Sequence, residues 1–244
     1  MSDIAPYESL SEDWQRALAV VAHPDDLEFG SAAAVARWTA QGKEIVYCLV
    51  TSGEAGIDGL APDETKVLRE AEQRASAGVV GVSEVEFLGL PDGILEYGVA
   101  LRREITRVVR RHRPEIVITN NFRDTWDGAD ALNQADHIAT GRATLDAVRD
   151  AGNRWIFPEQ GLEPWNKVRQ VWAAGSPNGR HAVDITGTFD RGLASLEAHE
   201  AYLRGLGEGA FDPEEFLEGI GRGAGTRLGT RYAAPFEVFT INLF

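Results

Sequence analysis

The chain has 244 residues, of which 43% are hydrophobic and 25% are charged, a composition that excludes disordered and fibrous proteins. At roughly 150 residues per domain, this length predicts a single domain, 1–244, with a core at about 17–152 and a C-terminal extension at about 153–244. The formal net charge is −14, so nucleic acid and anionic lipid are poor partners for this surface.

The sequence also lacks the signals of a membrane or secreted protein. No apolar run approaches the roughly 20 residues that span a bilayer. Residues 1–13 are acidic, where a signal peptide is basic and then apolar. The single cysteine, Cys48, lies in an apolar run and is expected to be a buried thiol. We therefore expect a cytoplasmic protein without membrane insertion, and the sequence leaves a homo-oligomer open.

In the first two thirds of the chain, short apolar runs alternate with amphipathic stretches. The apolar runs predict strands buried on both faces, at residues 17–22, 44–50, 85–90 and 115–119. The stretches between them predict helices at residues 28–41, 62–78 and 99–112, with Gly42, Gly78 and Pro114 as stop signals. This alternation predicts an α/β fold with a mostly parallel sheet and helices on both of its faces.

The rest of the chain mixes helices and strands and predicts an α+β extension. We expect helices at residues 131–152, 188–203 and 212–220, and strands at residues 168–173, 182–185 and 234–241. The glycine-rich run 219–225 is suggestive of a nucleotide-binding loop, but no strand precedes it and no helix plainly follows. It is therefore predicted to be a flexible loop.

Groups that bind metals or sugars follow each of the first four predicted strands. In an open α/β sheet, ligands bind beyond the carboxyl ends of the strands. The first segment, His23-Pro24-Asp25-Asp26, has two carboxylates where a dinucleotide-binding protein has a glycine-rich turn, and carboxylates repel phosphate unless a cation lies between them. Helix capping explains one aspartate but not the whole tetrapeptide. The sequence therefore predicts a cation site.

Imidazole and carboxylate groups together are typical ligands of zinc, and a catalytic zinc takes three protein ligands and leaves a position for water. His23 and one of the two aspartates supply two of them. For the third, His137 follows the fourth strand at the start of a helix, whereas His112 ends a helix at the opposite edge of the sheet. We expect one zinc per chain with His137 as the third ligand, and other divalent transition metals stay open as alternatives.

Three segments at these strand ends and one that opens the fourth predicted helix resemble the PIG-L/LmbE-like zinc N-deacetylases. This family includes deacetylases of GlcNAc-phosphatidylinositol, of the mycothiol precursor, of chitin fragments and of glycopeptide antibiotics. The segments are Ala22-His23-Pro24-Asp25-Asp26, Thr51-Ser52-Gly53-Glu54, Leu90-Pro91-Asp92-Gly93 and Asp136-His137. The resemblance spans about residues 17–200. It implies a Rossmann-like core, zinc held by His23, Asp26 and His137, and Asp25 as general base. It also implies a small-molecule substrate, an N-acetyl amino sugar or glycoside.

One position departs from the family pattern. The helix that carries the last ligand usually begins His-Pro-Asp-His, and here it reads Gln134-Ala135-Asp136-His137. A glutamine amide can donate a hydrogen bond to an oxyanion but cannot supply a proton at neutral pH. The resemblance implies catalytic roles for Gln134 and Asp136, although Asp136 is also explained by a role in ordering the helix start.

Four further residues are candidates for the edge of the site. Asp92, Arg69 and Asn121 are expected to hold sugar hydroxyls, and His199 lies in a segment that resembles a later motif of the family. The alternatives are structural: Asp92 as a turn residue, Arg69 on a helix face, Asn121 in a loop and His199 as a buried, hydrogen-bonded histidine. The expected reaction is hydrolysis of an N-acyl group by zinc-activated water. Two other functions stay open: a zinc-dependent hydratase acting on an unsaturated carboxylate, and a metal-binding protein whose deacetylase activity is weak or lost through Gln134.

Overall fold

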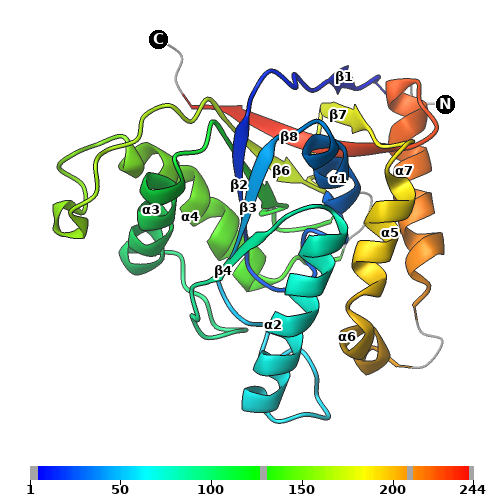
Figure 1. Cartoon of the computed structure of the whole chain (residues 1–244), viewed down its shortest axis with the longest axis horizontal. Helices are drawn as coiled ribbons and strands as arrows, with labels where there is room; N and C mark the ends of the chain where they lie inside the picture. The colour runs from blue at the N-terminus through cyan, green and yellow to red at the C-terminus, as the bar shows by residue number, and fades with distance from the viewer. Residues whose placement is uncertain (1–4, 127–130, 208–210, 242–244) are drawn as a thin grey trace.

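The computed structural model describes residues 5–126, 131–207 and 211–241, and it contains an eight-stranded sheet (Figure 1). The strands are β1 (Glu8–Ser9), β2 (Arg16–Val21), β3 (Glu44–Leu49), β4 (Glu84–Phe87), β5 (Ile116–Asn120), β6 (Gln170–Ala174), β7 (His181–Asp184) and β8 (Ala233–Thr240). Their order is β1-β7-β8-β6-β5-β2-β3-β4. Only β8 runs antiparallel to its described neighbours, β6 and β7. The predicted α/β class with a mostly parallel sheet is confirmed.

Helices cover both faces of this sheet (Figure 1). They are α1 (Ala32–Ala40), α2 (Pro62–Val79), α3 (Val99–His112), α4 (Ala135–Ala151), α5 (Phe189–Glu197), α6 (Glu200–Gly205) and α7 (Pro213–Leu228), with a 3₁₀ turn at Pro158–Gln160. Along β2, Ala17 and Ala19 join the core on the side of α1 and α5, while Leu18 and Val20 join the core on the side of α3 and α4. Cys48 lies wholly buried in the second core, as expected, and burial raises the pKa of its thiol.

The C-terminal extension completes the same sheet instead of forming a second one. β6 pairs in parallel with β5, and β8 then inserts between β6 and β7. Three buried tryptophans join the two parts: the ring of Trp14 packs edge to face against Trp38 at 5.4 Å and against Trp172 of β6 at 5.9 Å. Aromatic side chains bury a large apolar area, so this cluster ties the extension firmly to the core.

The prediction of a flexible loop at residues 219–225 is wrong, because this run lies inside α7. The helix has ordinary boundary signals: Asp212 accepts a hydrogen bond from the N–H of Glu215 at 3.0 Å, and Gly229 ends it with a φ of 85°. Gly225 is glycine for a packing reason, since a Cβ there would lie 2.6 Å from the carbonyl oxygen of Arg231. Gly225 thus permits close packing, whereas a glycine-rich run taken without its packing partners predicts a loop.

Three other predicted helices have different limits in the structure, and the one expected at residues 131–152 begins at Ala135. The helix expected at residues 188–203 is interrupted at His199, which separates α5 from α6. The helix expected to begin at residue 28 begins at Ala32, because residues 24–31 form turns that follow the His-Pro-Asp-Asp segment. None of the helices in the described residues is long and apolar enough to cross a membrane.

The sheet topology decides where the site lies. β2 pairs with β3 on one side and with β5 on the other, and β3 pairs with β4, all in parallel. The segments that follow these four strands therefore leave the sheet at the same edge. Such a point, where neighbouring connections diverge, is where open α/β sheets form their ligand sites.

Candidate active site

Three side chains with metal-binding atoms converge at the carboxyl ends of β2 and β5. The Nε2 atom of His137 lies 2.9 Å from Oδ1 of Asp26 and 3.2 Å from Nδ1 of His23. The Oδ2 atom of Asp26 lies 3.8 Å from the same Nδ1. All three residues are buried. The structure thus brings together two nitrogens and a carboxylate from segments more than 100 residues apart.

Both imidazoles are held by oxygen acceptors on the side away from this cluster. The Nε2 atom of His23 lies 3.0 Å from Oδ1 of Asp92 and 3.2 Å from Oδ2 of Asp136. The Nδ1 atom of His137 lies 2.9 Å from Oδ1 of Asn133. If each of these far nitrogens carries the proton, the near nitrogen of each ring presents its lone pair toward Asp26. Such outer acceptors fix the orientation of metal-binding histidines in proteins.

The loop after β4 fixes Asp136 in turn. Its carboxylate accepts the backbone N–H groups of Gly93 at 2.7 Å and of Leu95 at 2.9 Å. Together with His23 and Asp92, Asp136 forms a second group with metal-binding potential. Because its oxygens already accept hydrogen bonds from N–H groups, we assign Asp136 as a residue that orients the ring of His23.

The cluster of His23, Asp26 and His137 fits a zinc ion. Two lone pairs 3.2 Å apart repel each other unless a proton or a cation lies between them, and two histidines with one carboxylate form a typical donor set of catalytic zinc. The charges agree with this assignment. Burial by itself lowers the pKa of His23, but its hydrogen bonds to Asp136, Asp26 and Asp92 raise that pKa to about 12. The three carboxylates around the ring therefore stabilise positive charge at this position, and a bound cation would supply that charge in place of the second ring proton.

Asp25 is adjacent in sequence to this cluster but is held in a different environment. Its φ of 84° lies in the left-handed region, which aspartate seldom occupies. Its backbone N–H donates to Oε1 of Gln73 at 2.9 Å, and its carboxylate accepts from Arg69 at 3.1 Å. Burial raises the pKa of Asp25 to about 6, with Arg69 acting against this rise and Asp26 adding to it. A carboxylate with this pKa can accept a proton near neutral pH.

Arg69 also holds the loop that carries Asp25. It is 3% exposed, and its guanidinium donates to the carbonyl oxygens of Pro24 at 2.6 Å and of Gly53 at 3.0 Å. The ring of Tyr202 lies over the same guanidinium, with 4.2 Å between Cζ and the ring centroid. Arg69 therefore joins the segments after β2 and β3 and supports Asp25, while its expected contact with substrate stays a prediction.

A buried polar network lies behind Asp25. Glu28 accepts hydrogen bonds from Gln73 at 2.9 Å and from Ser76 at 2.6 Å, and Ser76 in turn contacts Ser195 of α5 at 2.7 Å. His199 has 0% exposure and faces Glu28 at 3.8 Å. Burial lowers the pKa of His199, but Glu28 outweighs this effect and raises it. The network fastens α2 and α5 to the turn that carries Asp25.

Sequence analysis did not single out Gln73, Asn133 or Glu28. The sequence spacing offered a signal for Gln73 and Asn133. Gln73 lies four residues after Arg69 and therefore on the same face of α2, and Asn133 lies four residues before His137. Recognising either required knowing which helix face lies against the site.

The remaining predicted residues lie around the cluster. Gln134 is the exposed residue that precedes α4, with its backbone N–H donating to Asn133. Asn121 is wholly buried and braces its own loop, where its amide donates to the carbonyl of Thr125 at 3.0 Å. The second carboxylate oxygen of Asp92 accepts a hydrogen bond from the backbone N–H of Ala55 at 2.8 Å. The expected substrate contacts of Asp92, Asn121 and His199 stay predictions.

Comparison with known proteins places this geometry in a family. The sequence model described as "PIG-L: GlcNAc-PI de-N-acetylase" matches residues 18–148, which is more than half of the chain. The chain belongs to this family. The matched span runs from β2 to near the end of α4, and so contains all three side chains of the candidate metal centre. Relatives that the chain matches are named deacetylases and amidases, so the chain is an enzyme of this amide-hydrolysing type, and the predicted family resemblance is confirmed.

A curated relative is similar over nearly the whole chain. The diacetylchitobiose deacetylase of Thermococcus kodakarensis is 29% identical over 228 residues, which cover 91% of this chain and 82% of the relative. Among solved structures, N,N'-diacetylchitobiose deacetylase from Pyrococcus horikoshii has a TM-score of 0.83 at 24% identity and covers 94% of this chain and 85% of its own. The hydratase GalB from Pseudomonas putida has a TM-score of 0.72 at 20% identity, and the match covers 94% of this chain and 98% of the hydratase. These two structures show that the fold is shared.

Proposed function

We propose that this enzyme removes an acetyl group from the nitrogen of an amino sugar or amino-sugar glycoside, with zinc as cofactor and Asp25 as general base. The observation that carries the proposal is the pairing of two different carboxylates. Asp26 faces two histidine nitrogens, and the neighbouring Asp25 has a pKa raised to about 6 by burial. Family membership and similarity to diacetylchitobiose deacetylase supply the substrate class.

The residues divide the chemistry between them. His23, Asp26 and His137 would hold the zinc ion, which when bound lowers the pKa of water and polarises an acyl oxygen. Asp25 accepts the proton of the water that attacks the acyl carbon, and Arg69 and Gln73 keep its carboxylate and backbone in place. Gln134 donates a hydrogen bond to the developing oxyanion. Once protonated, Asp25 returns the proton to the departing amine, because glutamine has none to give.

The test is acetate release from N,N'-diacetylchitobiose by the zinc-supplemented enzyme. Asp25→Asn should lower kcat by about 10²- to 10⁴-fold while the bound zinc stays, because a general base contributes about that factor. Asp63→Asn is the matched control, since Asp63 lies exposed in the first turn of α2. An Asp25→Asn variant with full activity would contradict the assigned base.

Gln134 favours a second candidate, a hydratase acting on an unsaturated carboxylate. At this position the family pattern has a histidine, and the same fold occurs in a hydratase. The effect of Gln134→His on deacetylation distinguishes the two functions. Restored histidine should raise deacetylation if loss of an acid limits the enzyme. Failure to deacetylate any N-acetyl sugar, together with hydration of an unsaturated dicarboxylate by the wild type, would favour the second candidate.

A further inference from the structure

Trp126 lies beside the candidate metal centre, in the segment that follows β5. Its ring meets the ring of His137 edge to face, with 5.8 Å between the ring centroids and an angle of 83° between the planes. Its Cζ3 atom lies 3.9 Å from the position that a Cβ on Gly175 would occupy. Because Gly175 directly follows β6, Trp126 lies at the carboxyl-terminal edge of the sheet, where open α/β sheets bind their ligands.

Hydrogen bonds hold the segment that carries Trp126 against the metal-binding side chain of His137. Asn133 makes the connection, because its Oδ1 lies 2.9 Å from Nδ1 of His137 and its amide donates to the carbonyl oxygen of Arg123 at 3.0 Å. The backbone N–H of Trp126 itself donates to the carbonyl oxygen of Ala131 at 3.1 Å. The indole ring therefore has a defined place before a substrate binds, which lowers the entropic cost of binding.

Packing in the hydrophobic core does not account for this tryptophan. Trp126 is half-buried and belongs to none of the hydrophobic clusters that the described residues form, whereas Trp14, Trp38 and Trp172 are buried in the core. Among the described residues, no hydrogen bond engages the indole N–H of Trp126, while that of Trp38 donates to Glu12 at 2.8 Å. An apolar ring surface and an N–H donor are therefore both available to a ligand at the metal centre.

These two groups suit a sugar ring. The face of an aromatic ring carries partial negative charge, and it attracts the C–H groups that make one side of a pyranose apolar. The hydroxyl groups at the rim of the sugar accept hydrogen bonds, so an indole N–H can bind one of them. In an N-acetyl amino sugar, a single nitrogen joins the acyl carbon to the ring. A substrate whose acyl group reacts at the metal centre therefore brings its ring close to the metal-binding residues and to Trp126.

We propose that Trp126 stacks on the ring of the amino sugar whose acetyl group is removed, and that it thereby selects ring-bearing over open-chain acetamides. The inference rests on the function proposed above and adds a substrate-binding residue to it. Trp126 contributes to binding and not to the chemical step, because it holds the sugar equally before and during attack on the acyl carbon. Loss of such an interaction raises KM and leaves kcat nearly unchanged.

The test is isothermal titration calorimetry of N,N'-diacetylchitobiose into the zinc-supplemented Asp25→Asn enzyme, in which turnover is slowed. In this background Trp126→Ala should raise the dissociation constant by about ten-fold or more, because the stacking contact and its apolar area are both lost. Trp126→Phe keeps an aromatic face and should raise it by only about three-fold.

Kinetics test the selectivity in the enzyme with Asp25 intact. Trp126→Ala should raise KM for N,N'-diacetylchitobiose by about ten-fold and change kcat by less than about two-fold. For N-acetylethanolamine, an acetamide without a ring, kcat/KM should not depend on the residue at position 126. An equal loss with both substrates would overturn the selection of a ring.

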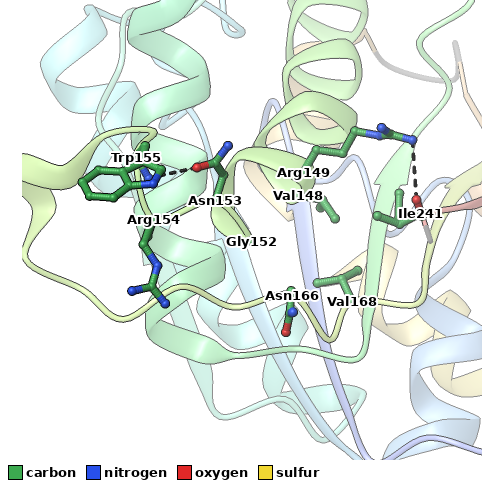
Figure 2. A pocket seen from close by; sticks show the side chains of 9 residues that line it. All are labelled: Val148, Arg149, Gly152, Asn153, Arg154, Trp155, Asn166, Val168 and Ile241. Carbon is green, nitrogen blue, oxygen red and sulfur yellow. Dashed lines mark hydrogen bonds between the residues drawn. The ribbon is translucent and has the colours of Figure 1, made fainter. Parts of the chain in front are cut away.

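Trp155→Ala is the matched control, because it removes the same side chain from a place remote from the metal centre. Trp155 is 80% exposed and lies on the loop that follows α4, at the opposite end of this helix from His137 (Figure 2). The variant should leave the dissociation constant, KM and kcat unchanged.

Bound zinc is measured in each variant, because the ring of Trp126 also packs against His137. Weaker sugar binding with zinc retained supports the inference. Loss of zinc from Trp126→Ala would make the tryptophan a support for His137 and would overturn it. Unchanged sugar binding by Trp126→Ala, while the wild type releases acetate, would overturn the role of Trp126 and leave the proposed function standing. If the wild type neither binds nor deacetylates an N-acetyl sugar, the proposed function itself fails and the role of Trp126 falls with it.

Discussion

Two adjacent aspartates have opposite properties in this site, although they are chemically identical. Asp26 faces His137 and His23, and these neighbours lower its pKa despite burial. Asp25 is turned away by a left-handed backbone, and burial raises its pKa to about 6. One carboxylate is therefore kept ionised, as a metal ligand must be, and the other is able to exchange a proton. Pairs of carboxyl groups whose environments separate their pKa values are a common basis for acid and base roles.

The raised pKa of Asp25 predicts the pH dependence of the reaction. The protonated carboxyl cannot accept a proton, so kcat/KM should rise as Asp25 ionises and then level off, with a midpoint no higher than about pH 6 because a cation on the neighbouring Asp26 favours the ionised form. The measurement is acetate release between pH 4.5 and 8, with bound zinc determined at each pH as a control for metal loss. A rate that is flat or falls as the pH rises over this whole range while zinc stays bound would argue against Asp25 as the base.

The carboxylates of Asp92 and Asp136, which hold Nε2 of His23, should influence the zinc affinity of the site. Asp136→Asn and Asp92→Asn each weaken the acceptor that holds Nε2 of His23, so each should reduce zinc affinity by about 10- to 100-fold. His137→Ala removes a ligand and should abolish stoichiometric binding. Zinc affinity is measured by competition with a coloured chelator. Unchanged affinity in both asparagine variants would show that the ring of His23 is oriented by other contacts.

At the scale of elements, α7 shows how the same residue type serves different purposes. Gly223 is exposed, and nothing lies within 4 Å of the position of a Cβ, whereas a Cβ on Gly225 would meet the backbone of Arg231. Gly223→Ala should therefore stabilise the protein by about 0.5–1 kcal/mol, since alanine is the better helix former. Gly225→Ala should destabilise it by about 1–3 kcal/mol through overpacking. Urea unfolding measures both, and a neutral result at both positions would contradict the packing of α7.

Most elements were predicted from local patterns, and the errors have local causes. Apolar runs located β2, β3 and β5, because strands buried on both faces have a strong signal. The two-residue strand β1 has no such signal, since both of its residues are exposed. The break at His199 was missed because residues on both sides of it favour a helix. There the chain changes direction beside the buried Glu28, a contact that lies 171 residues away in sequence.

At the scale of the whole molecule, folding of the sheet and binding of a metal ion should be coupled. Zinc would bind the folded chain only, because its ligands come from segments joined through β2 and β5. Free zinc at 100 times the dissociation constant should add about 2.7 kcal/mol to the free energy of unfolding. For a chain of this length that corresponds to a rise in Tm of about 5–10 °C.

Differential scanning calorimetry with and without a chelator measures this shift. His137→Ala is the control, because it should unfold at the same temperature in both conditions. A wild-type Tm that does not respond to zinc or chelator would contradict the metal centre, whatever the activity of the enzyme.

The sequence by itself determined the α/β class, the edge of the sheet at which the chemistry gathers, and the segments that contribute to it. These properties follow from hydrophobic periodicity and from the order of strands and helices, which are local or nearly so. Only the tertiary structure showed that Asp92 and Asp136 share His23, and that Gln73 and Glu28 support Asp25. These features depend on distances between side chains that are far apart in the chain, and such distances are set by how the layers pack.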